Sequence, residues 1–183
     1  MKLIELSKTG KHAGRYFAQV DDEDYEYLNQ WNYYVVKSKS GFYAARGLWD
    51  NSIKNNRNVP MQNDILHVEK GLIVDHIDRN GLNNTRANLR ACTKQQNNQN
   101  RSKVKKATSS KYIGAVFVDK KKTHITASNT KIVYSYKRWA CRIKLNGKTI
   151  YIGDFKTEIE AAIAYNKKAK ELFGEFANLN VIE

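Results

Sequence analysis

Residues 71–92 read GLIVDHIDRNGLNNTRANLRAC, and this stretch decides the fold of the central part of the chain. It begins with an apolar run that is typical of a buried strand and that ends in the pair Asp75-His76. The Asp, Asn and Gly residues within 78–81 then favour a turn. The sequence therefore predicts a strand whose last two residues carry a carboxylate and an imidazole.

A very polar helix is predicted directly after this stretch. Thr93 and Gln96 have the spacing of a capping box, which opens a helix at residue 94 that we expect to reach about residue 103. A helix with so few apolar residues seldom forms for packing reasons alone. We therefore expect it to present Asn97 or Asn100 inward for another purpose.

These residue types suit metal-assisted cleavage of a phosphodiester. The carboxylate of Asp75 and the amide oxygen of Asn97 are hard ligands of the kind that Mg²⁺ and Mn²⁺ prefer. The imidazole of His76 can deprotonate a water, because its reference pKa is about 6.5. Successive strand residues point to opposite faces, so Asp75 and His76 reach one site only at a strand end or bulge, which the turn allows.

The full pattern is more specific than its parts. An Asp-His pair on its own is more often structural, but here strand, turn, Asn-Leu-Arg and Thr-x-x-Gln-Asn follow one another. This series resembles the HNH endonucleases, specifically the His-Asn-Asn variant of phage-intron homing enzymes. The resemblance implies a ββα-metal fold in which Asp75 and Asn97 bind the metal, His76 is the general base and Asn88 braces the loop between the strands. Because the third position is Asn instead of His, we expect Mg²⁺ or Mn²⁺ rather than Zn²⁺.

Residues 111–183 predict a three-stranded antiparallel sheet with one helix laid across it. An Asn-Gly turn signal separates two of the strands, and a second capping box opens the helix, which we expect to stop at Gly174. The polar, basic segment that follows the first strand is expected to be a loop. The predicted elements are strand 112–118, loop 119–130, strand 136–145, strand 148–155 and the helix after Thr157.

The alternation in the middle strand assigns its two faces. One set of side chains can be covered by the helix stripe, namely Trp139, Cys141, Ile143 and Leu145. The other set is basic and includes Arg138, Arg142 and Lys144. Such a face can contact DNA, although polar sheet faces are also common for solubility alone.

Several motifs of this part are similar to the AP2 domain. They are SKYIGAV at 110–116, RWACRI at 138–143, YIGDF at 151–155, EAAIAYN at 160–166 and LFGEFANLN at 172–180. The resemblance covers about seventy residues. It implies that the face of the three-stranded sheet binds double-stranded DNA, and it implies no target sequence.

The fold class expected for the whole chain is α+β. Residues 1–60 predict a small N-terminal α+β scaffold, with a strand ending at Val20, a helix after Asp21 and a hairpin around residues 38–41. Residues 61–101 form the predicted ββα-metal module, 102–110 a basic linker and 111–183 the AP2-like domain. In the linker, Lys105 and Lys106 are placed to lie along phosphates, although a solvated loop without a partner is the alternative.

Composition limits the function classes further. The chain has 183 residues with a formal net charge of +14, and residues 102–183 alone contribute +10, from 17 basic and 7 acidic side chains. An excess of this size indicates a polyanionic partner. The absence of a long apolar run argues against a membrane span, and the first residues lack a signal peptide's apolar core. Two cysteines far apart suit a reducing compartment, so the expected location is the cytoplasm of a bacterial or phage-infected cell.

The function predicted from the sequence is a metal-dependent, homing-type DNA endonuclease. Arg90 and Arg101 are predicted to contact phosphate, and the protein is expected to act as a monomer on DNA, with a dimer as the alternative. One site per chain predicts nicking unless the protein dimerises or rebinds. A sequence-specific DNA-binding protein with a degenerate nuclease fold is the second hypothesis. An RNA-binding, ribosome-associated protein is the third, and it rests on charge alone.

Overall fold

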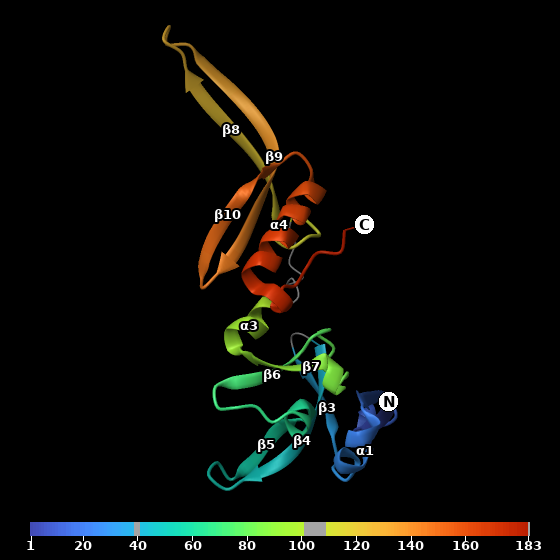
Figure 1. The fold of residues 1–183 in the computed structure, drawn as a ribbon. Helices are drawn as coiled ribbons and strands as arrows, with labels where there is room; N and C mark the ends of the chain where they lie inside the picture. Colours follow the sequence, from blue (N-terminus) through green and yellow to red (C-terminus); the bar gives the residue numbers. More distant parts are fainter. Residues whose placement is uncertain (39–40, 101–108, 183) are drawn as a thin grey trace. The chain divides into compact units, whose positions relative to one another are not determined.

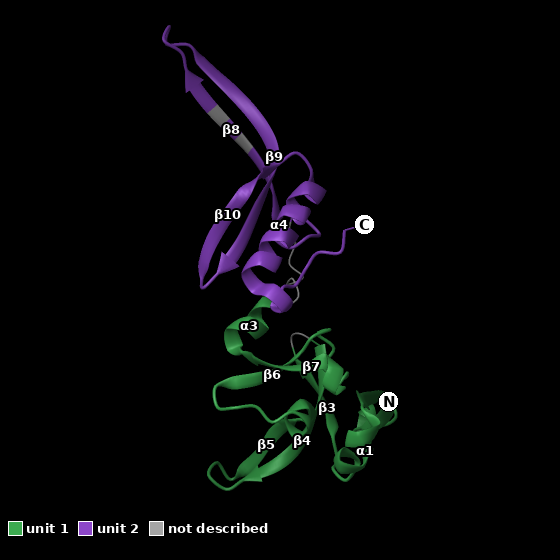
Figure 2. Ribbon diagram, in the orientation of Figure 1, with its two compact units in different colours: residues 1–102 green, residues 103–183 purple. Residues whose placement is uncertain are grey.

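The computed structural model describes residues 1–38, 41–100 and 109–182, which form two compact units. Unit 1 spans residues 1–102 and unit 2 spans residues 103–183 (Figure 2). The expected α+β class is confirmed, because each unit combines small antiparallel sheets with helices. The finer domain boundaries remain predictions. Among the described residues no helix has the length and apolar character to cross a membrane.

Unit 1 contains two hairpins, a three-stranded sheet and three short helices (Figure 1). The strand, helix and hairpin expected within residues 1–60 are present, and a further strand lies on either side of them. The expected strand before the turn and the capped helix after it are also present, but the helix ends at Gln99 and not near residue 103. The elements in chain order are β1 Lys2–Leu6, β2 Tyr16–Val20, α1 Asp22–Asn29, β3 Tyr34–Ser38, β4 Gly41–Asp50, β5 Asn55–Pro60, α2 Met61–Ile65, β6 Leu72–His76, β7 Leu89–Thr93 and α3 Lys94–Gln99.

One hydrophobic core holds unit 1 together. It combines side chains from the first sixty residues with Val74 of β6 and Leu89 of β7. These two residues lie on the same face of the β6–β7 hairpin, since side chains alternate along a strand. The core thereby anchors one face of this hairpin and leaves Asp75 and its partner Arg90 on the other face. Its other buried members are Ile4, Leu6, Ala18, Val20, Leu28, Tyr33, Ala44, Met61 and Ile65.

Ion pairs tie the first sixty residues to the segment that follows. Arg46 of β4 meets Asp64 of α2 at 2.8 Å, and both side chains are largely buried. The hydroxyl of Tyr33 donates to the same carboxylate at 2.7 Å. Arg86, in the loop after β6, pairs with Asp24 of α1 at 2.6 Å. The contacts of Asp64 thus fix α2, and those of Arg86 fix the loop between β6 and β7, against the N-terminal elements.

Unit 2 is the expected three-stranded antiparallel sheet with a helix on one face (Figure 1). The strands are β8 Ala115–Ile125, β9 Lys131–Leu145 and β10 Lys148–Phe155, in the order β10-β9-β8, and the helix is α4 Glu158–Phe173. Cys141 and Ile143 of β9 are buried under α4, as the alternation predicts. Asn146 and Gly147 form the tight turn with positive φ angles of 50° and 80°.

The segment 119–130 is not the loop that the sequence led us to expect. β8 continues to Ile125 and β9 begins at Lys131, and the two strands stay paired from Asp119↔Lys137 to Ile125↔Lys131. The lysine run hides this strand, because it interrupts the apolar alternation on which the prediction rests. Cross-strand backbone pairing with a partner rich in Ile, Val and Tyr stabilises it instead.

Candidate active site

The β6–β7 hairpin determines how the candidate residues are presented. Asp75 lies opposite Arg90 in the strand register, and His76 lies opposite Leu89. Because Val74 and Leu89 face the core, alternation places His76 on the core face and Asp75 on the other face. The two candidate side chains therefore leave the last two positions of β6 on different faces. Because β6 ends at His76, and because the negative charge of Asp75 still acts on the imidazole and its pKa, the two groups lie close together at the strand end.

Asp75 is a buried carboxylate with a cationic partner. It is 6% exposed, and Arg90 contacts its Oδ2 through Nη2 at 2.9 Å and Nε at 3.1 Å. Asn100 donates to the same oxygen at 3.0 Å. Within the described part of the chain, every hydrogen bond to this carboxylate ends on Oδ2. The described contacts thus hold Oδ2 and leave Oδ1 for a further ligand.

Asn100 connects Asp75 to the backbone of its neighbour. This residue follows the last turn of α3 and is 6% exposed. Besides its bond to Asp75, its Nδ2 donates to the carbonyl oxygen of His76 at 3.0 Å. Of the two asparagines expected to face inward, Asn100 is the buried one, whereas Asn97 is half-buried.

The thiol of Cys92 lies close to both predicted metal ligands. Cys92 is 1% exposed, and its sulfur accepts a hydrogen bond from the backbone N–H of Asn97. Burial and then the negative charge of Asp75 raise the pKa of this thiol. The α3 backbone at Asn97 therefore packs next to the Asp75 face of the hairpin. No hydrogen bond from another described residue engages the Asn97 side chain.

His76 is held by a fully buried amide. Its Nε2 lies 3.1 Å from Oδ1 of Asn84, which is 0% exposed. The amide nitrogen of Asn84 points to the carbonyl of Gly81 at 3.4 Å, and its backbone N–H donates to the carbonyl of Gln19 at 2.8 Å. Asn84 is thus fixed both by its own loop and by β2. Sequence reasoning assigned it no role, because nothing in the local pattern distinguishes it from Asn83 beside it.

The contact with Asn84 determines the tautomer of His76. An amide oxygen only accepts hydrogen bonds, so Nε2 carries the proton and the lone pair lies on Nδ1. Burial lowers the pKa of His76 below its ordinary value of 6.5, against the opposing effects of Asn84, Asp78 and Asp75. The imidazole is therefore neutral near pH 7 and can accept a proton at Nδ1.

Asn88 spans the loop between the two strands. It is 8% exposed, and its Nδ2 donates to Oδ1 of Asp78 at 2.9 Å and to the carbonyl of Asn83 at 2.8 Å. Its Oδ1 accepts the backbone N–H of Asp78 at 3.0 Å. The loop that leaves β6 is therefore closed on itself immediately after His76.

This strand–loop–strand–helix segment has known relatives. Residues 67–99 match the HNH endonuclease family model. An uncharacterized HNH endonuclease of Acanthamoeba polyphaga mimivirus is 38% identical over 118 residues, which cover 63% of this chain and 51% of that protein. The chain thus spans about half the length of this curated relative. No solved structure gives a significant match. We call residues 67–99 the HNH segment, and it contains Asp75, His76, Asn88 and Asn97.

The donor set of the HNH segment suits a hard divalent cation. Within residues 1–38, 41–100 and 109–182, no group of three or more His, Cys, Asp or Glu side chains is arranged to hold a metal ion. The available donors are Oδ1 of Asp75 and the amide oxygen of Asn97. Magnesium is commonly held by one or two such oxygens together with waters and substrate phosphates. The residues present therefore fit Mg²⁺ or Mn²⁺ better than a zinc site.

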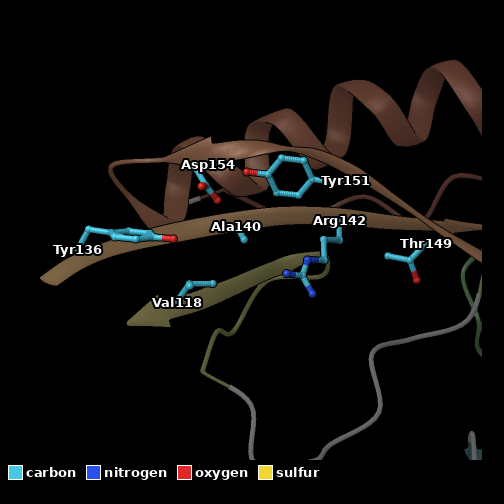
Figure 3. Close-up of a pocket in the computed structure, with 7 residues that line it drawn as sticks. All are labelled: Val118, Tyr136, Ala140, Arg142, Thr149, Tyr151 and Asp154. Atoms are coloured by element: carbon cyan, nitrogen blue, oxygen red, sulfur yellow. The ribbon is translucent and has the colours of Figure 1, made fainter. Parts of the chain in front are cut away.

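The three basic residues predicted on the sheet face of unit 2 are exposed there. Arg138, Arg142 and Lys144 occupy alternate positions of β9 on the face opposite α4. Figure 3 shows Arg142 on this face beside Tyr151 and Thr149 of β10, where they line a shallow pocket.

The remaining predicted DNA contacts stay untested. Arg90 is only 10% exposed because it is paired with Asp75, so a phosphate contact by this residue remains a prediction. Arg101, Lys105 and Lys106 lie outside the described residues.

Proposed function

We propose that the protein is a DNA endonuclease that hydrolyses phosphodiester bonds with the help of Mg²⁺ or Mn²⁺. The observation that carries the proposal lies within the HNH segment: His76, held at Nε2 by the buried amide of Asn84, follows directly on the buried carboxylate of Asp75. This pair combines a general base with a hard ligand, which are the two components that metal-assisted hydrolysis of a phosphodiester requires.

The chain's own residues have separate tasks in this reaction. Nδ1 of His76 accepts a proton from the attacking water, whose oxygen forms a bond to phosphorus while the bond from phosphorus to the 3′ oxygen breaks. The products are a 5′ phosphate and a 3′ hydroxyl, which takes its proton from solvent. Asp75 and Asn97 would hold the divalent cation, which would neutralise the negative charge that develops during the reaction. Asn88 keeps the loop in place, so that His76 is not displaced from the end of β6.

Unit 2 is proposed to hold the duplex. Its sheet face presents Arg138, Arg142 and Lys144, and residues 102–183 carry a net charge of +10. By its resemblance to AP2 domains this face would lie against DNA, with Arg101, Lys105 and Lys106 following the backbone. A homing-type role in a phage or its host, and action as a monomer on DNA, belong to the same proposal.

A second candidate function is DNA binding without cleavage. The observation that favours it is the ion pair of Asp75 with Arg90. The guanidinium of Arg90 occupies the side of the carboxylate to which a metal ion could otherwise bind. An arginine in this position competes with a divalent cation for the same negative charge. The two candidates differ in whether bound DNA is cut.

Supercoiled-plasmid relaxation distinguishes them. The wild type and His76→Ala are compared in Mg²⁺, Mn²⁺ and EDTA, with His67→Ala as a matched control, because His67 is an exposed histidine at the start of the same segment. We expect metal-dependent nicking by the wild type and by His67→Ala, and none by His76→Ala, while all three bind DNA equally in a mobility-shift assay. Equal nicking by His76→Ala contradicts the assignment of the base. Binding without nicking by all three establishes the second candidate.

A further inference from the structure

The β8–β9 hairpin continues well beyond the sheet that carries it. Its outer part pairs residues 119–125 with 131–137 in seven successive register pairs, whereas β10 accompanies β9 only from Trp139 to Leu145. Figure 1 shows this outer part extending past both β10 and α4. We call it the ribbon. At about 3.3 Å per residue, seven pairs give it a length of about 23 Å.

The ribbon is strongly basic. Residues 119–137 contain five lysines and one aspartate, a net charge of +4. Lys121, Lys131 and Lys137 are exposed, and the described part of the chain gives none of them an ion pair. Edge strands do use lysines to prevent aggregation, but a few suffice for that purpose. This excess of positive charge, with three described lysines exposed, points to an acidic partner.

The ribbon also exposes large apolar side chains near its tip. Ile125 is 63% exposed, Val133 53%, Tyr134 52% and Ile132 36%. A two-stranded hairpin with no core beneath it is only marginally stable in water. A partner that covers both the lysines and these apolar groups would remove this exposure. Duplex DNA offers both features, since its phosphates flank grooves lined by base edges and sugars.

The ribbon continues the face that is proposed to bind DNA. Even-numbered residues of β9 share one face, so Tyr134 and Tyr136 lie on the same side as Arg138 and Arg142. A duplex against the sheet would therefore continue along the ribbon. Lys131, Lys137 and Lys121, which pairs with Ser135, lie on the other face of the ribbon. The major groove is about 12 Å wide and admits a two-stranded ribbon of this kind.

We infer that the ribbon is a second DNA-binding element, which lies along a groove of the duplex held by the sheet face and lengthens the contacted site. The inference rests on the proposed function in taking duplex DNA as the partner and the sheet face of unit 2 as its site. At 3.4 Å per base pair, a ribbon of about 23 Å adds about seven base pairs to the site. Ile132 and Tyr134, on the same face as Arg138, contact the groove. Lys121, Lys131 and Lys137, on the outer face, reach past the edges of the ribbon to the phosphates that flank the groove.

The test uses the full chain in EDTA, so that it is independent of cleavage. In one variant, residues 119–137 are replaced by Asn-Gly, the turn that already joins β9 to β10, so that Val118 and Arg138 close the shortened hairpin. In a second variant the ribbon stays intact and carries Lys121→Gln, Lys131→Gln and Lys137→Gln. The matched control removes three exposed lysines outside the ribbon, with Lys156→Gln, Lys167→Gln and Lys170→Gln.

Binding of random-sequence fluorescent DNA duplexes is measured as a function of duplex length and salt. We expect the shortened variant to occupy a site about seven base pairs smaller. We expect the intact-ribbon variant to lose up to about 2.7 units of log–log salt slope, at about 0.9 per phosphate contact. The control should lose none of its slope. An unchanged site size together with an unchanged slope overturns the inference, even if the wild type binds DNA.

The outcomes also separate this inference from the proposed function. If the wild type cuts DNA but the ribbon variants match it in site size and slope, the ribbon inference fails alone. If the ribbon variants change as expected but no metal supports cutting, the nuclease assignment fails alone. Preference of the wild type, but not of the shortened variant, for duplex RNA over duplex DNA contradicts the choice of partner.

Discussion

Asn100→Ala is expected to destabilise unit 1 and to disturb the candidate active site at the same time. The buried amide donates one hydrogen bond to the carboxylate of Asp75 and one to the carbonyl of His76, both at 3.0 Å. A bond to a charged group contributes about 1.5–3 kcal/mol and a neutral one about 0.5–1.5 kcal/mol. Loss of both hydrogen bonds should therefore lower the free energy of unfolding by about 3 kcal/mol. For a unit of about one hundred residues this corresponds to a fall in melting temperature of roughly 12–24 °C.

Calorimetry and urea unfolding of the full chain measure the loss, and plasmid nicking measures its functional effect. Lys94→Ala is the matched control, because Lys94 is an exposed residue of the same helix, and it should change the free energy of unfolding by less than about 0.5 kcal/mol. Asn100→Asp keeps the shape but removes both donors and adds a carboxylate beside Asp75, so it should be at least as destabilised. If Asn100→Ala unfolds within about 0.5 kcal/mol of the wild type, the bridge between α3 and β6 does not have the role argued for it.

Three further predictions concern the base, the core and unit 2. The nicking rate should rise with pH and reach half its maximum below pH 6.5, since burial lowers the pKa of His76. Asn84→Asp should move this rise to higher pH, because a carboxylate beside Nε2 favours the imidazolium. Asp64→Asn breaks the buried pair with Arg46 and should cost about 3 kcal/mol in urea unfolding. Thr157→Ala removes the cap of α4 and should lower the stability of unit 2 by about 1 kcal/mol, as measured by calorimetry.

Elements whose signals are local could be predicted from the sequence. The capping boxes at Thr93 and Thr157 and the Asn-Gly turn after Leu145 all appear where they were expected, because each depends on a few adjacent residues. Strand β5 and the ribbon could not be predicted, since their residues are mostly polar or basic. Backbone pairing across a turn, of β5 with β4 and of the outer part of β8 with β9, makes them strands.

The candidate site was predictable in its residue types and less so in its contacts. Asp75 and His76 follow from the end of a strand, but the position of Arg90 depends on the register across the loop 77–88. That register places Arg90 opposite Asp75 as an ion-pair partner, whereas the sequence suggested only a basic residue available for phosphate. The position of Asn84 likewise depends on its backbone hydrogen bond to β2, which lies more than sixty residues earlier in the chain.

The use of amides at this site has a chemical consequence. Each of the two adjacent residues at the end of β6 is held by a buried asparagine, His76 by Asn84 and Asp75 by Asn100. An amide orients its partner through hydrogen bonds but carries no charge, so it leaves burial as the main influence on the pKa of His76. A carboxylate at position 84 would hold the ring equally well but would stabilise its protonated form. Orientation without charge keeps the imidazole available as a base near neutral pH, which general-base catalysis by His76 requires.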